Sequence, residues 1–149
     1  MTESEVIINI NVDKKSELMT IMSLFKRKNP TSEEGKPPSK IDWNPLTDLR
    51  QLEELVDLSN KTLVVIFKHS TRCGISMMVL RQFENEFHYG DEVMLYYLDL
   101  LQHREISNAV ADRFGVEHES PQIIVIKNGE ATYNASHESI AAADLKDFL

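Results

Sequence analysis

The chain has 149 residues, of which 42% are hydrophobic and 27% charged, which suits one globular domain with its own core and argues against a two-domain enzyme. The formal net charge is -8, and residues 41–149 hold nine basic against eighteen acidic side chains, which argues against nucleic acid as a partner. The single cysteine excludes an internal disulfide, so any disulfide must be made with another molecule.

The first 40 residues differ in composition from the rest. Residues 29–40, NPTSEEGKPPSK, combine Pro, Gly, Ser and charge without apolar periodicity, which is typical of a linker. The segments EVIININ and ELMTIMSLFKRK before it offer too little apolar surface to fold alone. We therefore expect residues 1–40 to be a poorly ordered N-terminal extension and linker, and residues 41–149 to form the domain. A sharper hypothesis is that translation begins at Met22, because MSLFKRK reads like an ordinary start.

Targeting and membrane-spanning segments are not expected. The acidic start MTESEV is unlike the basic n-region of a secretory signal. No apolar run approaches the ~20 residues that a helix needs to span a bilayer. We therefore expect a cytoplasmic protein with no membrane partner.

The domain is predicted to begin with a helix and a buried strand. After Pro45, leucines recur at helical spacing as far as Leu58, behind a possible Thr47 cap. Residues 62–68, TLVVIFK, form a β-branched apolar run of strand length, which predicts a buried central strand. Helical spacing returns over residues 75–87 and predicts the second helix.

The second half of the domain alternates strands and helices. The pattern predicts a strand, a helix and a strand at residues 93–100, 104–114 and 122–127. Asn128-Gly129 is a strong hairpin signal before EATYN, and SHESIAAADLKDFL predicts an Ala-rich terminal helix capped by Ser136. Two parallel crossovers, a hairpin and a last helix predict an α/β protein with a central mixed four-stranded sheet flanked by helices, which is the thioredoxin-like fold.

Cys73 follows the predicted central strand directly and falls at the first turn of the next helix. Unpaired amide groups and the partial positive charge of a helix N-terminus favour a thiolate there. Arg72 and Lys68 add positive charge nearby, and Ser76, one helical turn away, could donate a hydrogen bond to the sulfur. A lone cysteine is more often a small buried hydrophobe. The polar residues before this one and Gly74 after it predict instead a reactive thiol in a monothiol CGIS motif.

Ser120-Pro121 comes immediately before the strand QIIVIK, where a proline opens a run that must pair with its neighbours. In a thioredoxin-like fold this is the cis-proline site. Its role there is to free the backbone of the preceding residue, here Ser120, to pair with an extended thiol-bearing ligand. The alternative is a trans proline at the start of a strand.

Three motifs in the same order, HSTRCGIS, HESPQIIVIKNGE and ASHESI, resemble those of the monothiol bacilliredoxins, the YtxJ-like proteins of the bacillithiol system. The resemblance covers roughly residues 41–149. It implies a thioredoxin-fold oxidoreductase that removes bacillithiol from mixed disulfides on client proteins, with bacillithiol as a co-substrate and without a permanently bound cofactor. The attacking residue would be Cys73. Supporting roles would fall to Arg72, Gly74, Ser76, Ser120 and Pro121.

The chain departs from the family motif, TCPIS, at two positions, where Arg72 replaces threonine and Gly74 replaces proline. Proline at the first helical position preorganises the turn, so Gly74 is expected to leave the turn looser. Arg72 is expected to favour the thiolate further. The chemistry is expected to survive, with an altered redox potential.

Two other functions fit the same residues. The CGIS motif differs at one place from the CGFS motif of monothiol glutaredoxins, which carry iron–sulfur clusters with glutathione, but NGEATYNASHES lacks the Gly-Gly and Asp that bind glutathione there. The second alternative is a non-catalytic thioredoxin-like module in which Cys73 is a redox sensor. The five histidines show no metal-ligand spacing, so no metal site is predicted.

Overall fold

A mixed sheet of five strands organises the protein, whose computed structural model describes residues 41–149. The strand order is β1-β3-β2-β4-β5. The strands are β1 (Asn44–Pro45), β2 (Leu63–His69), β3 (Val93–Asp99), β4 (Gln122–Lys127) and β5 (Glu130–Ser136). The helices are α2 (Arg50–Leu58), α3 (Gly74–Glu86) and α4 (Arg104–Phe114). The predictions of an extension, a linker and a start at Met22 lie outside the described residues.

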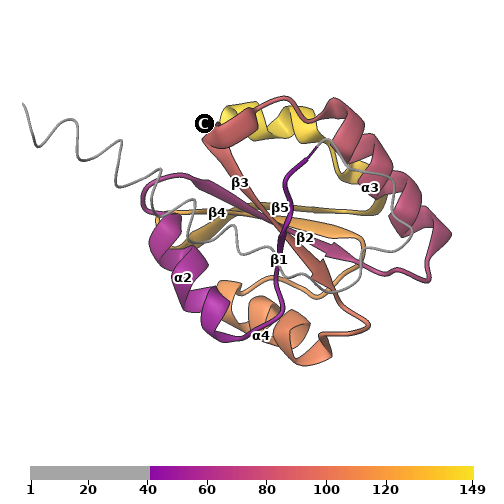
Figure 1. Cartoon of the computed structure of the whole chain (residues 1–149), viewed down its shortest axis with the longest axis horizontal. Helices are drawn as coiled ribbons and strands as arrows, with labels where there is room; N and C mark the ends of the chain where they lie inside the picture. The colour runs from indigo at the N-terminus through magenta and orange to yellow at the C-terminus, as the bar shows by residue number, and fades with distance from the viewer. Residues whose placement is uncertain (1–40) are drawn as a thin grey trace, which may run out of the picture. The chain divides into compact units, whose positions relative to one another are not determined.

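The sheet separates two layers of helices. Figure 1 shows α2 and α4 on one face of the sheet and α3 with the C-terminal segment on the other. An ion pair at 3.5 Å joins Arg113 of α4 to Glu53 of α2. Of the described helices, none combines the length and the apolar composition that crossing a bilayer requires.

The central strand β2 pairs in parallel with β3 and antiparallel with β4. All seven of its residues are buried, as the apolar run predicted. Because strand side chains alternate between faces, Val65 and Phe67 pack in the core beneath α3, together with Leu80 and Phe83 of that helix. Each large apolar side chain buried in this way contributes about 1.5–3 kcal/mol relative to the exposed chain.

The predicted four strands are present, and the structure adds a fifth, β1, at the edge of the sheet next to β3. This strand has only two residues, one of them a proline. Strand periodicity cannot be recognised in so short a segment, and proline is depleted in strands. The prediction of a four-stranded sheet therefore missed one edge strand.

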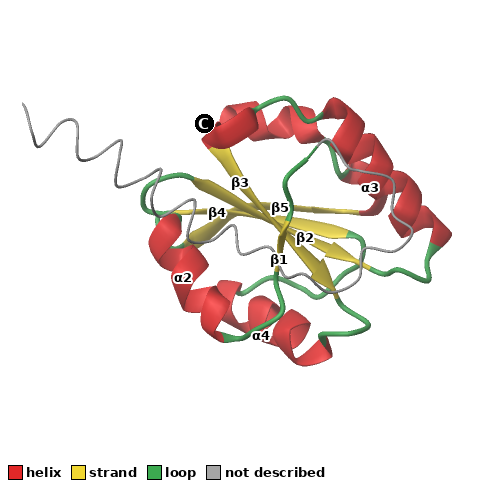
Figure 2. Ribbon diagram, viewed as in Figure 1, coloured by secondary structure: helices red, strands yellow, loops and turns green. Residues whose placement is uncertain are grey.

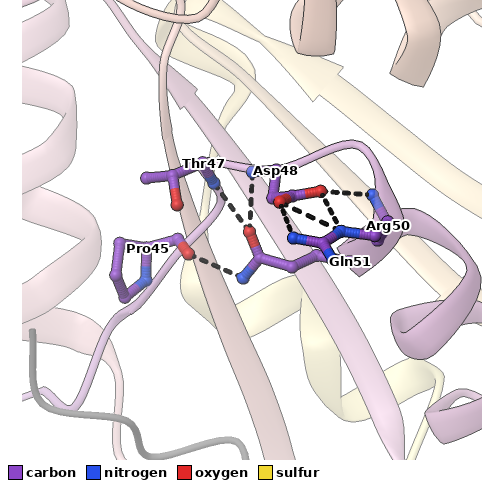
Figure 3. A network of polar contacts seen from close by, with 5 residues as sticks. All are labelled: Pro45, Thr47, Asp48, Arg50 and Gln51. Atoms are coloured by element: carbon purple, nitrogen blue, oxygen red, sulfur yellow. Dashed lines mark hydrogen bonds and ion pairs between the residues drawn. The ribbon is translucent and has the colours of Figure 1, made fainter.

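The first helix begins later than its leucine pattern suggested, and without the predicted Thr47 cap. Asp48 accepts the Arg50 amide at 2.9 Å, and the Gln51 side chain accepts the amides of Thr47 and Asp48 (Figure 3). The Gln51 amide group also donates to the Pro45 carbonyl at 2.9 Å. Asp48 thus accepts the Arg50 amide, which a Thr47 cap could have accepted, and Gln51 holds the backbone just before the helix.

The hairpin between β4 and β5 turns at the predicted residues. Asn128 and Gly129 have φ values of 51° and 79°, the left-handed backbone that a two-residue hairpin turn requires at both positions. Ser59 supports this turn from the end of α2, because its hydroxyl accepts the Gly129 amide at 2.8 Å and its carbonyl accepts the Asn128 amide at 2.9 Å.

The prediction of a terminal α-helix capped by Ser136 is wrong. Ser136 is the last residue of β5, and two 3₁₀ segments follow, at His137–Ser139 and Ala142–Asp147. Figure 2 shows this end of the chain beside α3. Ala142 and Leu145, three residues apart, are both fully buried in the core. A 3₁₀ helix has three residues per turn and places both side chains on one face, so packing outweighs the α-helical preference of alanine.

Candidate functional site

Cys73 lies in the turn between β2 and α3, with its side chain partly exposed. Its backbone is extended, with φ -102° and ψ 119°, and it immediately precedes the first helical residue of α3. Its amide donates to the Ser70 carbonyl and its carbonyl accepts the Met77 amide, both at 3.1 Å. The predicted position at a strand-to-helix turn is confirmed. The N-terminus of a 13-residue helix favours a negative charge at this place.

The Ser76 hydroxyl has partners that the sequence did not indicate. Ser76 is fully buried, and its Oγ lies 2.7 Å from Nδ1 of His69 and accepts the Ser70 amide at 3.1 Å. Within residues 41–149, the hydrogen bonds do not include one between Ser76 and the Cys73 sulfur. Donation by Ser76 to the sulfur therefore stays a prediction, and His69, which lies in the first family motif but received no role from the sequence, enters the site. No periodicity relates a residue at a strand end to one on the following helix.

Arg72 and Gly74 flank Cys73, and both are exposed. Arg72 thus carries a solvated positive charge next to the cysteine in sequence. A side chain at position 74 would meet no atom within 4 Å of its Cβ. The start of α3 is therefore open on the side of Gly74.

Lys68 does not share the face of the sheet on which Ser76 lies, although the sequence placed it near the thiol. Its neighbours Phe67 and His69 face α3, so the alternation along β2 directs Lys68 toward α4. There Lys68 is fully buried, and its Nζ lies 3.1 Å from Nδ1 of His118. Burial lowers the pKa of Lys68 to about 8.

The peptide bond between Ser120 and Pro121 is cis, as predicted. The antiparallel register pairs Lys68 with Gln122, so Pro121 follows at the level of His69. The cis proline and the cysteine turn therefore lie at the same end of the sheet, where β2 ends and β4 begins. The Ser120 Oγ is buried and, in the described part of the chain, has no hydrogen-bond partner.

Buried side chains of β4 and β2 contact the loop before the cis proline. The Gln122 side chain donates to the Glu117 carbonyl at 2.8 Å and accepts the Glu119 amide at 3.4 Å. His118 adds the contact with Lys68. On the other side, the Pro121 carbonyl accepts the His137 amide at 2.9 Å. These contacts fix the backbone on both sides of Ser120.

A hollow of about 340 Å³ lies between the loop before α2 and the first turn of α4, and Cys73 does not line it. Among residues 41–149, no group of three or more His, Cys, Asp or Glu side chains is arranged to hold a metal ion. The thiol of Cys73 is partly exposed, which is the access that attack on a disulfide of another molecule requires.

Solved structures define the class to which this arrangement belongs. A candidate oxidoreductase with a thioredoxin fold matches with a TM-score of 0.60 and 32% sequence identity, covering 69% of this chain and 89% of its own. The thioredoxin of Malassezia sympodialis matches with a TM-score of 0.57 and 20% identity, over 77% and 94% of the two chains. The thioredoxin of Fasciola hepatica gives 0.55 and 20%, over 70% and 93%. The predicted thioredoxin fold is confirmed.

A family model described as monothiol bacilliredoxin BrxC matches residues 44–145. The chain belongs to the monothiol bacilliredoxin family, as its three motifs indicated. Family and fold together give it a thiol redox function within the thioredoxin-like oxidoreductases.

Proposed function

We propose that the protein is a monothiol thiol-disulfide oxidoreductase that removes bacillithiol from mixed disulfides on client proteins, with Cys73 as the nucleophile. The observation that carries the proposal is the position of Cys73, partly exposed at the first turn of α3, in a member of the monothiol bacilliredoxin family. Bacillithiol is the small thiol that this family implies. The proposed place of reaction is the cytoplasm, where structural disulfides are rare and thiols are kept reduced.

The first half of the cycle transfers the small thiol to the enzyme. The Cys73 thiolate attacks the bacillithiol sulfur of the mixed disulfide and forms a new disulfide to it. The bond between the two original sulfurs breaks, and the client leaves as a thiolate that takes a proton from water. The client is thereby reduced, and Cys73 is oxidised to a mixed disulfide.

The second half needs another thiol, because the sequence contains no second cysteine. The thiolate of a free bacillithiol attacks the bacillithiol sulfur bound to Cys73, which forms oxidised bacillithiol and releases the Cys73 thiolate. A partner redoxin with a reduced thiol could supply the same two electrons. The reductant is thus external to the chain.

The neighbouring residues support this exchange in the proposal. Arg72 adds positive charge that favours the thiolate. Gly74 and Ser76 shape the first turn of α3, and Ser76 could donate to the sulfur after rotation of its hydroxyl. The backbone of Ser120, fixed before the cis Pro121, pairs with the extended segment that carries the target disulfide.

The test follows a reporter protein that has one cysteine loaded with bacillithiol. Intact-protein mass spectrometry records the loss of bacillithiol in the presence of excess free bacillithiol. Wild type is expected to unload many reporter molecules per enzyme, whereas Cys73→Ser is expected to leave only the slow uncatalysed exchange. A Cys73→Ser variant that also carries Asn60→Cys is the matched control, because Asn60 is exposed on a turn outside the site. A cysteine there should not restore turnover.

The alternatives give different results. Unloading of one reporter per protein and no more would identify a redox sensor. A visible spectrum after anaerobic reconstitution with iron, sulfide and a small thiol would identify a cluster carrier. Full turnover by Cys73→Ser would remove the proposal, and equal rates with a glutathionylated reporter would remove the assignment of bacillithiol.

A further inference from the structure

We propose that His69 is a positioning residue of the cysteine site, which acts through Ser76 to fix the turn that carries Cys73. The inference rests on the proposed function, because it concerns how the same thiol is held. His69 is the last residue of β2 and is 1% exposed. Its ring faces α3 and packs against Tyr97 of β3, with the ring centroids 5.6 Å apart.

The Ser76 hydroxyl joins three consecutive parts of the chain. Its Oγ lies 2.7 Å from Nδ1 of His69, at the end of the strand, and 3.1 Å from the amide of Ser70, the first residue of the turn. Ser76 itself lies in the first turn of α3. Both side chains, His69 and Ser76, are buried, so water does not compete for this hydrogen bond. The strand end is thereby tied to the helix start.

Cys73 lies inside this closed set of contacts. Its amide donates to the carbonyl of Ser70, and its carbonyl accepts the Met77 amide. Gly74, which follows it, has no side chain to order the turn, and a Cβ there would meet no atom within 4 Å. Among residues 41–149, the buried contact between His69 and Ser76 is therefore a side-chain link between the two ends of the cysteine turn.

The donor and acceptor capacity of the Ser76 hydroxyl allows His69 to influence its orientation as well. A serine hydroxyl has one proton and two lone pairs, and the Ser70 amide occupies one lone pair. When Nδ1 of His69 has no proton, the Ser76 hydroxyl donates a hydrogen bond to that nitrogen. When Nδ1 has a proton, His69 donates the hydrogen bond instead, and the Ser76 hydroxyl hydrogen must point away from that nitrogen. His69 thus decides the direction in which the Ser76 hydroxyl points.

The test measures the rate of Cys73 alkylation by iodoacetamide at pH 7, and in parallel the unloading of the reporter. His69→Phe keeps a ring against Tyr97 but removes Nδ1, and Ser76→Ala removes the hydroxyl. Each is expected to lower both rates by about tenfold, because small misplacements of a reacting group are costly. The double variant is expected to lose no more than either single variant, since both remove one link. His88→Phe, at an exposed histidine beyond the end of α3, is the matched control.

Two rescues separate positioning from packing. His69→Asn places an amide near the position of Nδ1 and is expected to recover most of the alkylation rate, although it loses the ring. Adding Gly74→Pro to His69→Phe is expected to recover part of the rate, because proline orders the first helical turn by itself. If His69→Phe fails to fold by circular dichroism, His69→Asn and Ser76→Ala carry the test.

The inference is overturned if Ser76→Ala and His69→Phe alkylate at the wild-type rate, or if their effects multiply in the double variant. It is also overturned if His69→Asn is as slow as His69→Phe. Alkylation requires neither bacillithiol nor a client, so these outcomes stand apart from the proposed function. Suppose that wild type does not unload the reporter, while the His69 and Ser76 variants slow alkylation as expected. That result would contradict the proposed function and support the role of His69.

Discussion

Lys68 and His69 are adjacent in β2, both are buried, and they serve opposite layers of the molecule. His69 faces α3 and lies 2.7 Å from Ser76, in the helix that follows Cys73. Lys68 faces the other layer and lies 3.1 Å from His118, in the loop before the cis proline. The end of one strand thus contacts both halves of the candidate site.

The two contacts differ in their electrostatic cost. The contact between His69 and Ser76 involves a serine hydroxyl, a group that carries no charge. Lys68 is a desolvated amine, and burial lowers its pKa from 10.5 to about 8, so at pH 7 the fold carries a buried ammonium. We therefore expect the contact between His69 and Ser76 to position the cysteine turn through an uncharged hydroxyl. Burial of Lys68 next to the cis-proline loop is expected to lower the free energy of unfolding.

The largest stability effect is expected from Lys68→Met, which removes the buried charge and with it the difference between the two contacts. The variant is expected to be more stable than wild type at pH 7, by about 1–3 kcal/mol, because an apolar side chain replaces a desolvated ammonium. Between pH 8 and 10.5 the unfolded chain holds a proton that the folded chain has released. Raising the pH therefore stabilises wild type, and the advantage of the variant shrinks.

Urea unfolding of both proteins at pH 7 and pH 10 measures this change. Apart from His118, whose pKa the charge of Lys68 lowers, the other titratable groups are common to the two proteins, so the difference between them reports chiefly on Lys68. A variant that is less stable than wild type at pH 7 would show that the contact with His118 outweighs the cost of burying the amine.

A smaller effect is expected from Gly74→Pro, which restricts the backbone of the turn that carries Cys73. Gly74 is the first residue of α3, its Cβ position is open, and Cys73 before it already has the extended backbone that a following proline requires. The variant is expected to gain about 0.4–1 kcal/mol in the free energy of unfolding. Thermal unfolding measures the gain. Gly90→Pro is the matched control, because its φ of +56° excludes proline and predicts destabilisation.

The smallest effect is expected from His118→Asn. Partial burial, then the charges of Lys68 and Arg104, lower the pKa of His118. As the pH falls below about 6.5, the unfolded chain binds a proton that the folded chain resists, so wild type loses stability. His118 is exposed, so solvent screening limits this loss to a few tenths of a kcal/mol. Unfolding at pH 5 and 7.5 compares the two proteins, and equal pH slopes would contradict the prediction.

Most of the secondary structure could be predicted because its signals are local. The helix at 104–114 and the strand at 122–127 have the predicted bounds, since the first keeps helical spacing and the second is a continuous apolar run of strand length. The hairpin residues were predictable because only a few residue types accept a positive φ. The position of Cys73 followed from these patterns, because it falls between the end of an apolar strand run and the start of helical spacing.

The sequence by itself therefore determined the order of the three α-helices and the four longer strands, the turn that carries Cys73 and the family motifs. Only the tertiary structure decided the edge strand β1, the 3₁₀ ending and the partners of the buried polar side chains. Lys68 and His118 lie 50 residues apart, and His69 meets Ser76 across a turn. Local periodicity fixes the face on which a side chain lies, but its partner is set by which elements pack together.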